Sequence, residues 1–103
     1  MREIIFNKNN YNTYKDFYED IFKELDGDKF VDFDELKNCN YNADILNEFM
    51  WYNSRKNIKY IFKNFNIEEI NQQQTIDDYE YSMIIGIFKD FANEYSNNAV
   101  VFE

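Results

Sequence analysis

Residues 2–25 have the sequence REIIFNKNNYNTYKDFYEDIFKEL, and this stretch decides the fold. Residues 2–7 are rich in β-forming side chains and end at an asparagine, which predicts a short strand. Thr13 is a typical helix N-cap, and Asp16 follows at the acidic position of a capping box. Apolar residues then recur at spacings of three and four and predict a helix over 14–25, with Tyr14, Phe17, Tyr18, Ile21 and Leu25 on one face. The chain therefore begins with a strand followed by an amphipathic helix.

The remaining sequence continues this alternation of strands and helices. Residues 26–40 have no clear period and are expected to form a loop. Five further elements are expected: a helix over about 41–52, a strand over 58–65, a short helix over 67–74, a long helix after Thr75 and a strand over 99–102. The order is β-α-α-β-α-α-β, and strands separated by helices favour a parallel sheet. The predicted class is α/β, with a three-stranded parallel sheet packed with about four helices in a single domain over residues 1–103.

Aromatic residues are frequent enough to fill a core in a chain of this size. The 103 residues include eleven Phe and nine Tyr, and 45% of all residues are apolar, which favours one packed domain over disorder. The second helix should bury Ile45, Leu46, Phe49 and Met50, and Trp51 is expected in the same core. On the long helix the expected buried stripe comprises Tyr79, Met83, Ile84, Ile87, Phe88, Phe91 and Tyr95.

The net charge of −9 is distributed unevenly along the chain. Residues 16–48 hold eleven acids and three lysines, a net of −8, whereas residues 49–65 hold four cations and no acid, a net of +4. The overall balance would repel phosphate, so direct binding of nucleic acid is not expected. The pattern indicates an acidic surface that steers a basic partner, and acidity that serves only solubility is the alternative.

The sequence lacks the residues that most catalytic and cofactor sites need. Histidine is absent, Cys39 is the only cysteine, and Gly27 and Gly86 are the only glycines. The usual general base, a zinc cluster and a glycine-rich phosphate loop are therefore missing, and we expect neither an enzyme nor a cofactor. A lone thiol favours a reducing compartment. Because no signal-peptide pattern or membrane-spanning stretch is visible, the sequence predicts a cytoplasmic protein without a membrane partner.

Residues 24–35, ELDGDKFVDFDE, offer a metal-binding alternative. They resemble an EF-hand calcium loop, in which oxygen ligands occupy the first, third, fifth, ninth and twelfth places. Lys29 stands where the loop needs glycine and would bring a positive charge beside the ion. A divergent calcium-binding module is therefore an alternative function, with the ligands Glu24, Asp26, Asp28, Asp32 and Glu35.

Three stretches of the chain resemble the barstar family, whose members inhibit secreted bacterial ribonucleases. They are residues 4–25, residues 42–48 with the sequence NADILNE, and residues 87–90 ahead of the last strand. The second stretch is similar to the family's Asn-x-Asp-x-Leu-x-acid pattern on its second helix. The resemblance extends over nearly the whole chain. It implies a barstar-like fold and a protein whose carboxylates enter the basic cleft of a nuclease and imitate the phosphates of its substrate.

The resemblance also implies which residues bind the partner. Asp44 matches one inhibitory acid, Glu48 the dominant one, and Asp90 the acid of the last helix. Tyr41 corresponds to an aromatic of the preceding loop, whereas Asn47 replaces an aromatic that contacts the enzyme. The extra residues between the first two helices add further acids to this surface, among them Asp32 and Asp34.

The function implied by this resemblance is that of an immunity protein or antitoxin. Its partner would be a cognate basic nuclease toxin, an RNase in the family, bound as a monomer in a 1:1 complex. Contact-dependent growth inhibition is a natural system for such a divergent relative. Three alternatives remain beside it. They are the divergent calcium-binding module, an acidic interaction protein for another basic partner, and a helix face that is merely solvated.

Overall fold

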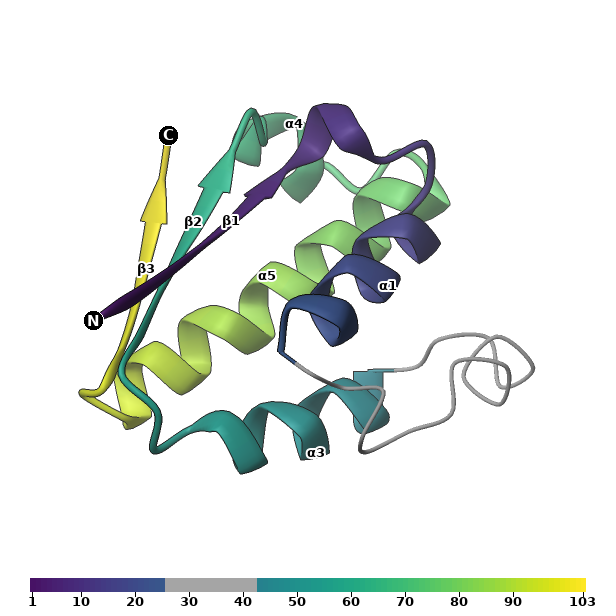
Figure 1. The fold of residues 1–103 in the computed structure, drawn as a ribbon. Coiled ribbons are helices and arrows are strands. Elements are labelled where there is room, and N and C mark those ends of the chain that lie inside the picture. The colour runs from purple at the N-terminus through teal and green to yellow at the C-terminus, as the bar shows by residue number, and fades with distance from the viewer. Residues whose placement is uncertain (26–42) are drawn as a thin grey trace.

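The computed structural model describes residues 1–25 and 43–103. Within them three parallel strands form one sheet in the order β1-β2-β3, with β1 at Arg2–Asn7, β2 at Ile58–Lys63 and β3 at Asn98–Phe102. Between the strands lie η1 (Lys8–Asn10), α1 (Tyr14–Glu24), α3 (Ala43–Asn53), α4 (Ile67–Asn71) and α5 (Ile76–Glu94) (Figure 1). The predicted α/β class, the three-stranded parallel sheet and the order β-α-α-β-α-α-β are confirmed. None of the described helices combines the length and the apolar character needed to cross a membrane.

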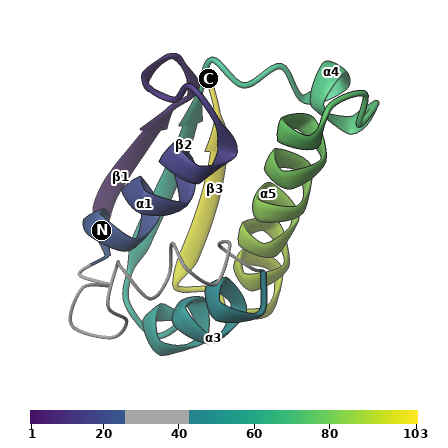
Figure 2. The ribbon, with the colours of Figure 1, turned by 90° about the vertical axis from the view of Figure 1, so that its right-hand side faces the viewer.

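The helices pack on one face of the sheet, so the described part of the fold has two layers (Figures 1 and 2). Side chains alternate between the two faces of a strand. Accordingly Ile4 and Phe6 of β1 are buried under the helices, whereas Ile5 between them is 57% exposed on the other face. On that open face Glu3 and Lys59 of the neighbouring strands form an ion pair at 3.7 Å.

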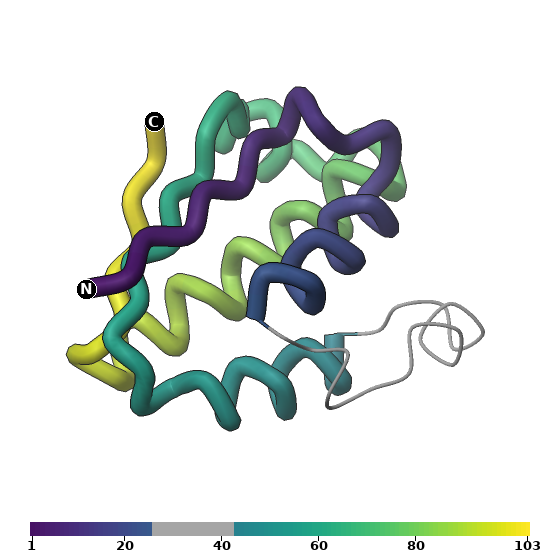
Figure 3. Tube along the Cα trace, viewed as in Figure 1, coloured from purple at the N-terminus to yellow at the C-terminus, as the bar shows by residue number. Residues whose placement is uncertain are grey.

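Phenylalanines from four elements meet at the centre of the core. Phe6 of β1 lies 5.5 Å from Phe17 of α1, 5.6 Å from Phe62 of β2 and 5.7 Å from Phe88 of α5, measured between ring centroids. Phe62 and Phe88 are themselves 5.2 Å apart. Tilted and edge-to-face arrangements at these separations are favourable, and all four rings are buried. This cluster fixes α1 and α5 against the middle of the sheet. Figure 3 shows the Cα trace of the two helices lying beside the sheet.

Two helix starts predicted from the sequence, those of α1 and α5, are confirmed. Asp16 Oδ2 accepts a hydrogen bond from the Thr13 backbone N–H at 3.2 Å, so the acid of the predicted capping box satisfies the start of α1. Thr75 Oγ1 accepts from the Asp78 N–H at 3.0 Å at the start of α5. The two helix starts are also joined, because the Tyr14 N–H donates to an oxygen of Asp77 at 3.0 Å.

One predicted boundary is wrong, and the predicted buried stripe of α5 is confirmed at Ile84, Ile87 and Phe88 but wrong at Tyr79. The short helix α4 ends at Asn71 rather than at residue 74, because Gln73 takes a left-handed backbone with φ of 53°. On α5, Tyr79 is 45% exposed, and the buried side chains are Tyr81, Ile84, Ile85, Ile87 and Phe88. Apolar residues cover so much of this helix that more than one set of them follows the three- and four-residue spacing of a buried stripe. Packing against the sheet decides which of these side chains are buried.

Burial raises the pKa of several tyrosines in this core. The effect holds for Tyr18 and Tyr60, and it raises the pKa of Tyr81 to about 12, with the nearby carboxylates of Asp77 and Asp16 adding to it. Burial favours the neutral phenol because the charged phenolate would lose its hydration. The folded state therefore keeps protons that the unfolded chain loses above its ordinary pKa of 10.0.

Opposite faces of β1 give a test of the sheet register. We expect Phe6→Ala to lower the free energy of unfolding by about 3–5 kcal/mol, because it removes a buried ring of β1 that contacts rings of three other elements. Ile5→Ala, one residue away on the open face, should cost less than about 1 kcal/mol. Urea denaturation of the two variants measures both values. Equal losses would contradict the assignment of these residues to opposite faces.

The tyrosines give a test at alkaline pH. Below about pH 10 the phenols are protonated in both states, so they should add no pH dependence to the free energy of unfolding. Above about pH 10 each should lower the free energy of unfolding by about 1.4 kcal/mol per pH unit. The loss arises because the unfolded state releases protons that the folded state holds. Urea midpoints taken from about pH 9 to about pH 11 measure this slope. Tyr81→Phe should make the slope shallower, and an unchanged slope would refute the role of this residue.

Candidate partner-binding surface

Helix α3 lies across the end of the sheet where the strands begin (Figures 1 and 2). Its buried apolar side chains are Leu46, Phe49 and Met50, as the sequence predicted, and Ile45 packs partly against the core. Phe49 stacks on Phe22 of α1 with ring centroids 4.7 Å apart. Helix α3 also packs against α5. These contacts hold one face of α3 against two other helices and leave the opposite face in solvent.

The carboxyl end of α3 is tied down by hydrogen bonds. Asn53 Nδ2 donates to the Phe49 carbonyl at 2.9 Å, and Ser54 Oγ donates to the Trp51 carbonyl at 2.7 Å. These bonds satisfy helix-end carbonyls that have no partner within the helix. Asn98 Nδ2 of β3 donates to the Ser54 carbonyl at 2.8 Å, so the helix end is also bound to the sheet. The solvent-facing side of α3 therefore belongs to a helix with a fixed position.

The exposed side of α3 carries Asp44, Asn47, Glu48, Trp51 and Tyr52, and we call these five residues the α3 face. They follow at helical spacings of three and four, so they lie along one side of the helix. Trp51 and Tyr52 are 59% and 58% exposed, and their rings meet edge to face at 5.4 Å. Two carboxylates, an amide and two large aromatic rings are thus displayed together.

Trp51 corrects one expectation from the sequence, which placed it in the core. Leu46, Phe49 and Met50 set the phase of the buried face, and Trp51 lies two turns after Asp44, on the opposite side. The spacing therefore contained the signal for its exposure, but the large apolar area of the indole favoured burial. Exposure at this place puts an aromatic residue beside the acids.

The carboxylates of the α3 face have no partner within the described part of the chain. Neither Asp44 nor Glu48 makes a hydrogen bond or an ion pair there, and both side chains are exposed. The acids of α1 differ. Asp16 accepts from two backbone N–H groups, and Asp20 Oδ2 accepts from the Tyr11 hydroxyl at 2.5 Å. Burial and the bond to Asp20 also raise the pKa of Tyr11.

An acidic hollow of about 390 Å³ lies beside α1 and contains these hydrogen-bonded acids. It is lined by Asn10, Tyr11, Asn12, Asp16, Glu19, Asp20 and Lys23. Two of its three carboxylates hold the start of α1 and the turn ahead of it. We therefore assign this hollow a structural role, in contrast to the α3 face.

The α3 face changes its charge toward the carboxyl end of the helix. A hollow of about 280 Å³ opens there between the end of α3 and the end of α5, lined by Trp51, Tyr52, Ser54, Arg55 and Tyr95. Arg55 is exposed and lies in the turn that follows the end of α3 at Asn53. A partner that covers the whole face would meet negative charge first, then aromatic rings, and then a guanidinium.

The other predicted site residues fall into two groups. Asp90 is exposed on α5, the helix against which α3 packs, so carboxylates occur on two adjacent helices. Tyr41, Asp32 and Asp34 lie outside the described residues, as do the calcium-loop positions Asp26, Asp28 and Glu35. Of the five ligands expected in that loop only Glu24 is described, at the last position of α1. In residues 1–25 and 43–103 no three histidine, cysteine or acidic side chains are grouped as a metal site requires.

Comparison with known proteins adds no assignment to this surface. No family model, no curated protein and no solved structure matches the chain.

The exposure of Trp51 can be tested in solution, because it is the only tryptophan. We expect red-shifted emission in the native protein and quenching by acrylamide nearly as efficient as in the urea-unfolded chain, since water and quencher reach the indole. Stern–Volmer titrations of native and unfolded protein measure this. Weak quenching of the native protein would place the indole in the core and remove the aromatic part of the α3 face.

Proposed function

We propose that this protein is an immunity protein or antitoxin that binds a basic nuclease toxin, an RNase in the simplest case, through the α3 face. The observation that carries the proposal is the pair Asp44 and Glu48, which are exposed, unpaired within the described chain and displayed beside Trp51 and Tyr52. The proposed partner is a cognate toxin bound in a 1:1 complex in the cytoplasm. Growth inhibition by cell contact is a setting in which such pairs act.

The electrostatics of the chain support a basic partner. With a net charge of −9, long-range attraction would speed the encounter with a positively charged cleft. A nuclease cleft is built to hold phosphates, and carboxylates pair well with the arginines that serve this purpose. Glu48 and Asp44 lie one helical turn apart, which lets the two carboxylates meet neighbouring cations.

The position of the surface supports a protein partner rather than a small ligand. In open α/β sheets small molecules bind in a crevice at the carboxyl ends of the strands. The α3 face instead consists of exposed side chains, and its helix lies at the amino ends of the strands (Figures 1 and 2). Exposed Trp and Tyr residues are enriched among the side chains that dominate the binding energy of protein interfaces. A convex helix with acids and aromatic rings fits a concave basic site on another protein.

The tight end of α3 supports inhibition by a rigid surface. Four hydrogen bonds from Asn53, Ser54, Asn97 and Asn98 hold the segment at residues 49–55. A surface that is already in its binding position loses less conformational entropy on association. We therefore expect α3 to enter the complex without a change in its backbone.

The proposal predicts a large effect of Glu48→Gln on binding. The partner should be the product of the neighbouring gene, a toxin with a basic carboxy-terminal nuclease domain. If Glu48 pairs with a buried cation there, the neutral side chain should weaken binding by about 30-fold or more, since losing one member of such a pair costs about 2–5 kcal/mol. Asp44→Asn should act in the same direction. Calorimetry with the purified toxin and survival of toxin-producing cells measure both effects.

A matched control is Glu68→Gln, which removes the same charge from an exposed site on α4, at the other end of the described fold. It should leave affinity and protection nearly unchanged. The proposed function fails if the neighbouring toxin neither binds the protein nor loses nuclease activity in its presence. It also fails if Glu68→Gln weakens binding as much as Glu48→Gln, because the effect would then be one of total charge alone.

A further inference from the structure

Strand β3 lies at an edge of the sheet and has β2 as its only neighbour in the described fold. The Asn97 carbonyl accepts from the Ile58 N–H at 3.1 Å, and the Glu103 N–H donates to the Phe62 carbonyl at 2.9 Å. In a parallel ladder the residues that bond one neighbour alternate with those that face away from it. Odd-numbered residues of β3 therefore bond β2, and Val100 and Phe102 direct their N–H and C=O groups to the open edge.

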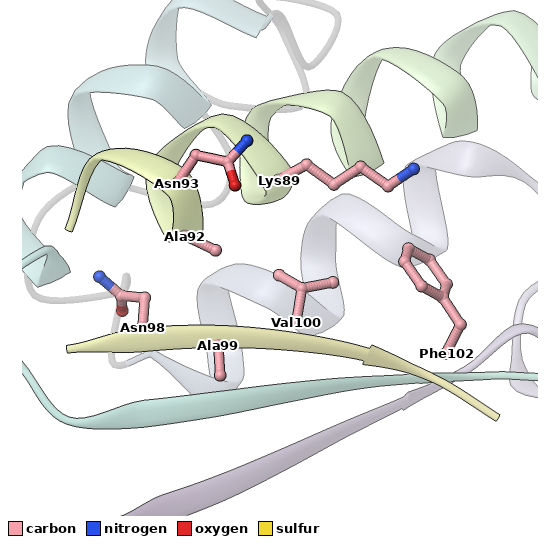
Figure 4. Close-up of a pocket in the computed structure, with 7 residues that line it drawn as sticks. All are labelled: Lys89, Ala92, Asn93, Asn98, Ala99, Val100 and Phe102. Atoms are coloured by element: carbon pink, nitrogen blue, oxygen red, sulfur yellow. The ribbon is translucent and has the colours of Figure 1, made fainter. Parts of the chain in front are cut away.

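A groove of about 410 Å³ runs beside this edge, between β3 and α5 (Figure 4). In Figure 4 Val100 and Phe102 point toward α5, whereas Ala99 points to the other face of the sheet. The small Ala92 leaves room on the α5 side, and Lys89 extends over Phe102 with Nζ 5.0 Å from the ring centroid. The described residues that line the groove include one cation and no anion.

We propose that this edge binds an extended segment of another protein as a fourth strand, with an acidic side chain of that segment facing Lys89. A row of outward N–H and C=O groups is complemented by the backbone of another strand, which supplies the same groups at the same spacing. Side chains of an added strand alternate as well, so those on the α5 side would enter the groove. The edge thus offers backbone pairing for affinity and the groove offers selection of side chains.

The charge of the groove selects the occupant. Among the described residues, Lys89 is the only charged one that lines it, and a carboxylate is its complement. A second copy of this chain is not the proposed occupant, because two molecules of net charge −9 repel each other. This inference does not depend on the α3 face, which lies on a different element.

Hydrogen exchange of the native protein provides the first part of the test. In the free protein the amides of Val100 and Phe102 should exchange much faster than those of Ala99 and Val101, which bond β2. The probe is a phage-displayed library of random linear peptides, selected on the full-length protein. Selected peptides should contain an acidic residue within a β-forming segment, and a synthetic copy should slow exchange at Val100 and Phe102.

Two variants separate the backbone and the side-chain contribution. Val100→Pro removes an outward N–H without removing a bond to β2, and proline is tolerated at such edge positions. It should abolish peptide binding, while far-UV circular dichroism stays native. Lys89→Glu should weaken binding by about tenfold or more. Lys63→Glu, the same charge change at an exposed residue at the end of β2, is the matched control and should bind normally.

Several results would overturn the inference. They are a failure to select any peptide, binding that protects amides other than Val100 and Phe102, and equal binding by the wild type and Lys89→Glu. If Val100 and Phe102 are protected in the free protein in a concentration-dependent manner, a second copy covers the edge and the proposed occupant is wrong. All of these measurements use the protein without its toxin, so their failure leaves the proposed function standing.

Discussion

The contact of Phe6, Phe17, Phe62 and Phe88 is the interaction on which the rest of the structure depends. These rings come from two strands and two helices, and they require α1 and α5 to pack on the same face of the sheet. A close-packed interior tolerates little displacement of such side chains. Helix α3 is then positioned by its stacking on α1 through Phe22 and Phe49 and by its contact with α5. The place of the candidate surface therefore follows from the core.

The acids of this chain perform two different tasks. Asp16, Asp20 and Asp77 accept hydrogen bonds that fix helix starts and a turn, and in this way they contribute to stability. Asp44 and Glu48 have no such partner in the described structure, and water solvates them at little cost to folding. We propose a binding role for them because exposed aromatic rings lie along the same side of α3. A carboxylate pair alone would be an ordinary solvated surface.

The two candidate surfaces differ in the chemistry that they recognise. The α3 face offers side-chain charge and aromatic area on a convex helix, whereas the β3 edge offers backbone hydrogen bonds beside a groove with a single lysine. The first selects a basic partner and the second an extended segment with an acid. The two surfaces are carried by different elements, and Asn98, which lines the groove, joins them through its hydrogen bond to the Ser54 carbonyl at the end of α3.

The sequence by itself determined the order of the elements, the parallel sheet and the helix starts, because caps such as Thr13 and Thr75 and runs of β-forming residues act within a few positions of the chain. It also placed Asp44 and Glu48 on one exposed side of a helix, since their spacing of four is a local property. Tertiary structure alone decided which apolar side chains of α5 are buried, because more of them share a helical spacing than the core takes up, and the choice depends on where the sheet and the neighbouring helices lie. The exposure of Trp51 was contained in the spacing of α3, but the large apolar area of the indole favoured burial in the prediction. The free edge of β3 and its groove likewise exist only once strands distant in the sequence have paired.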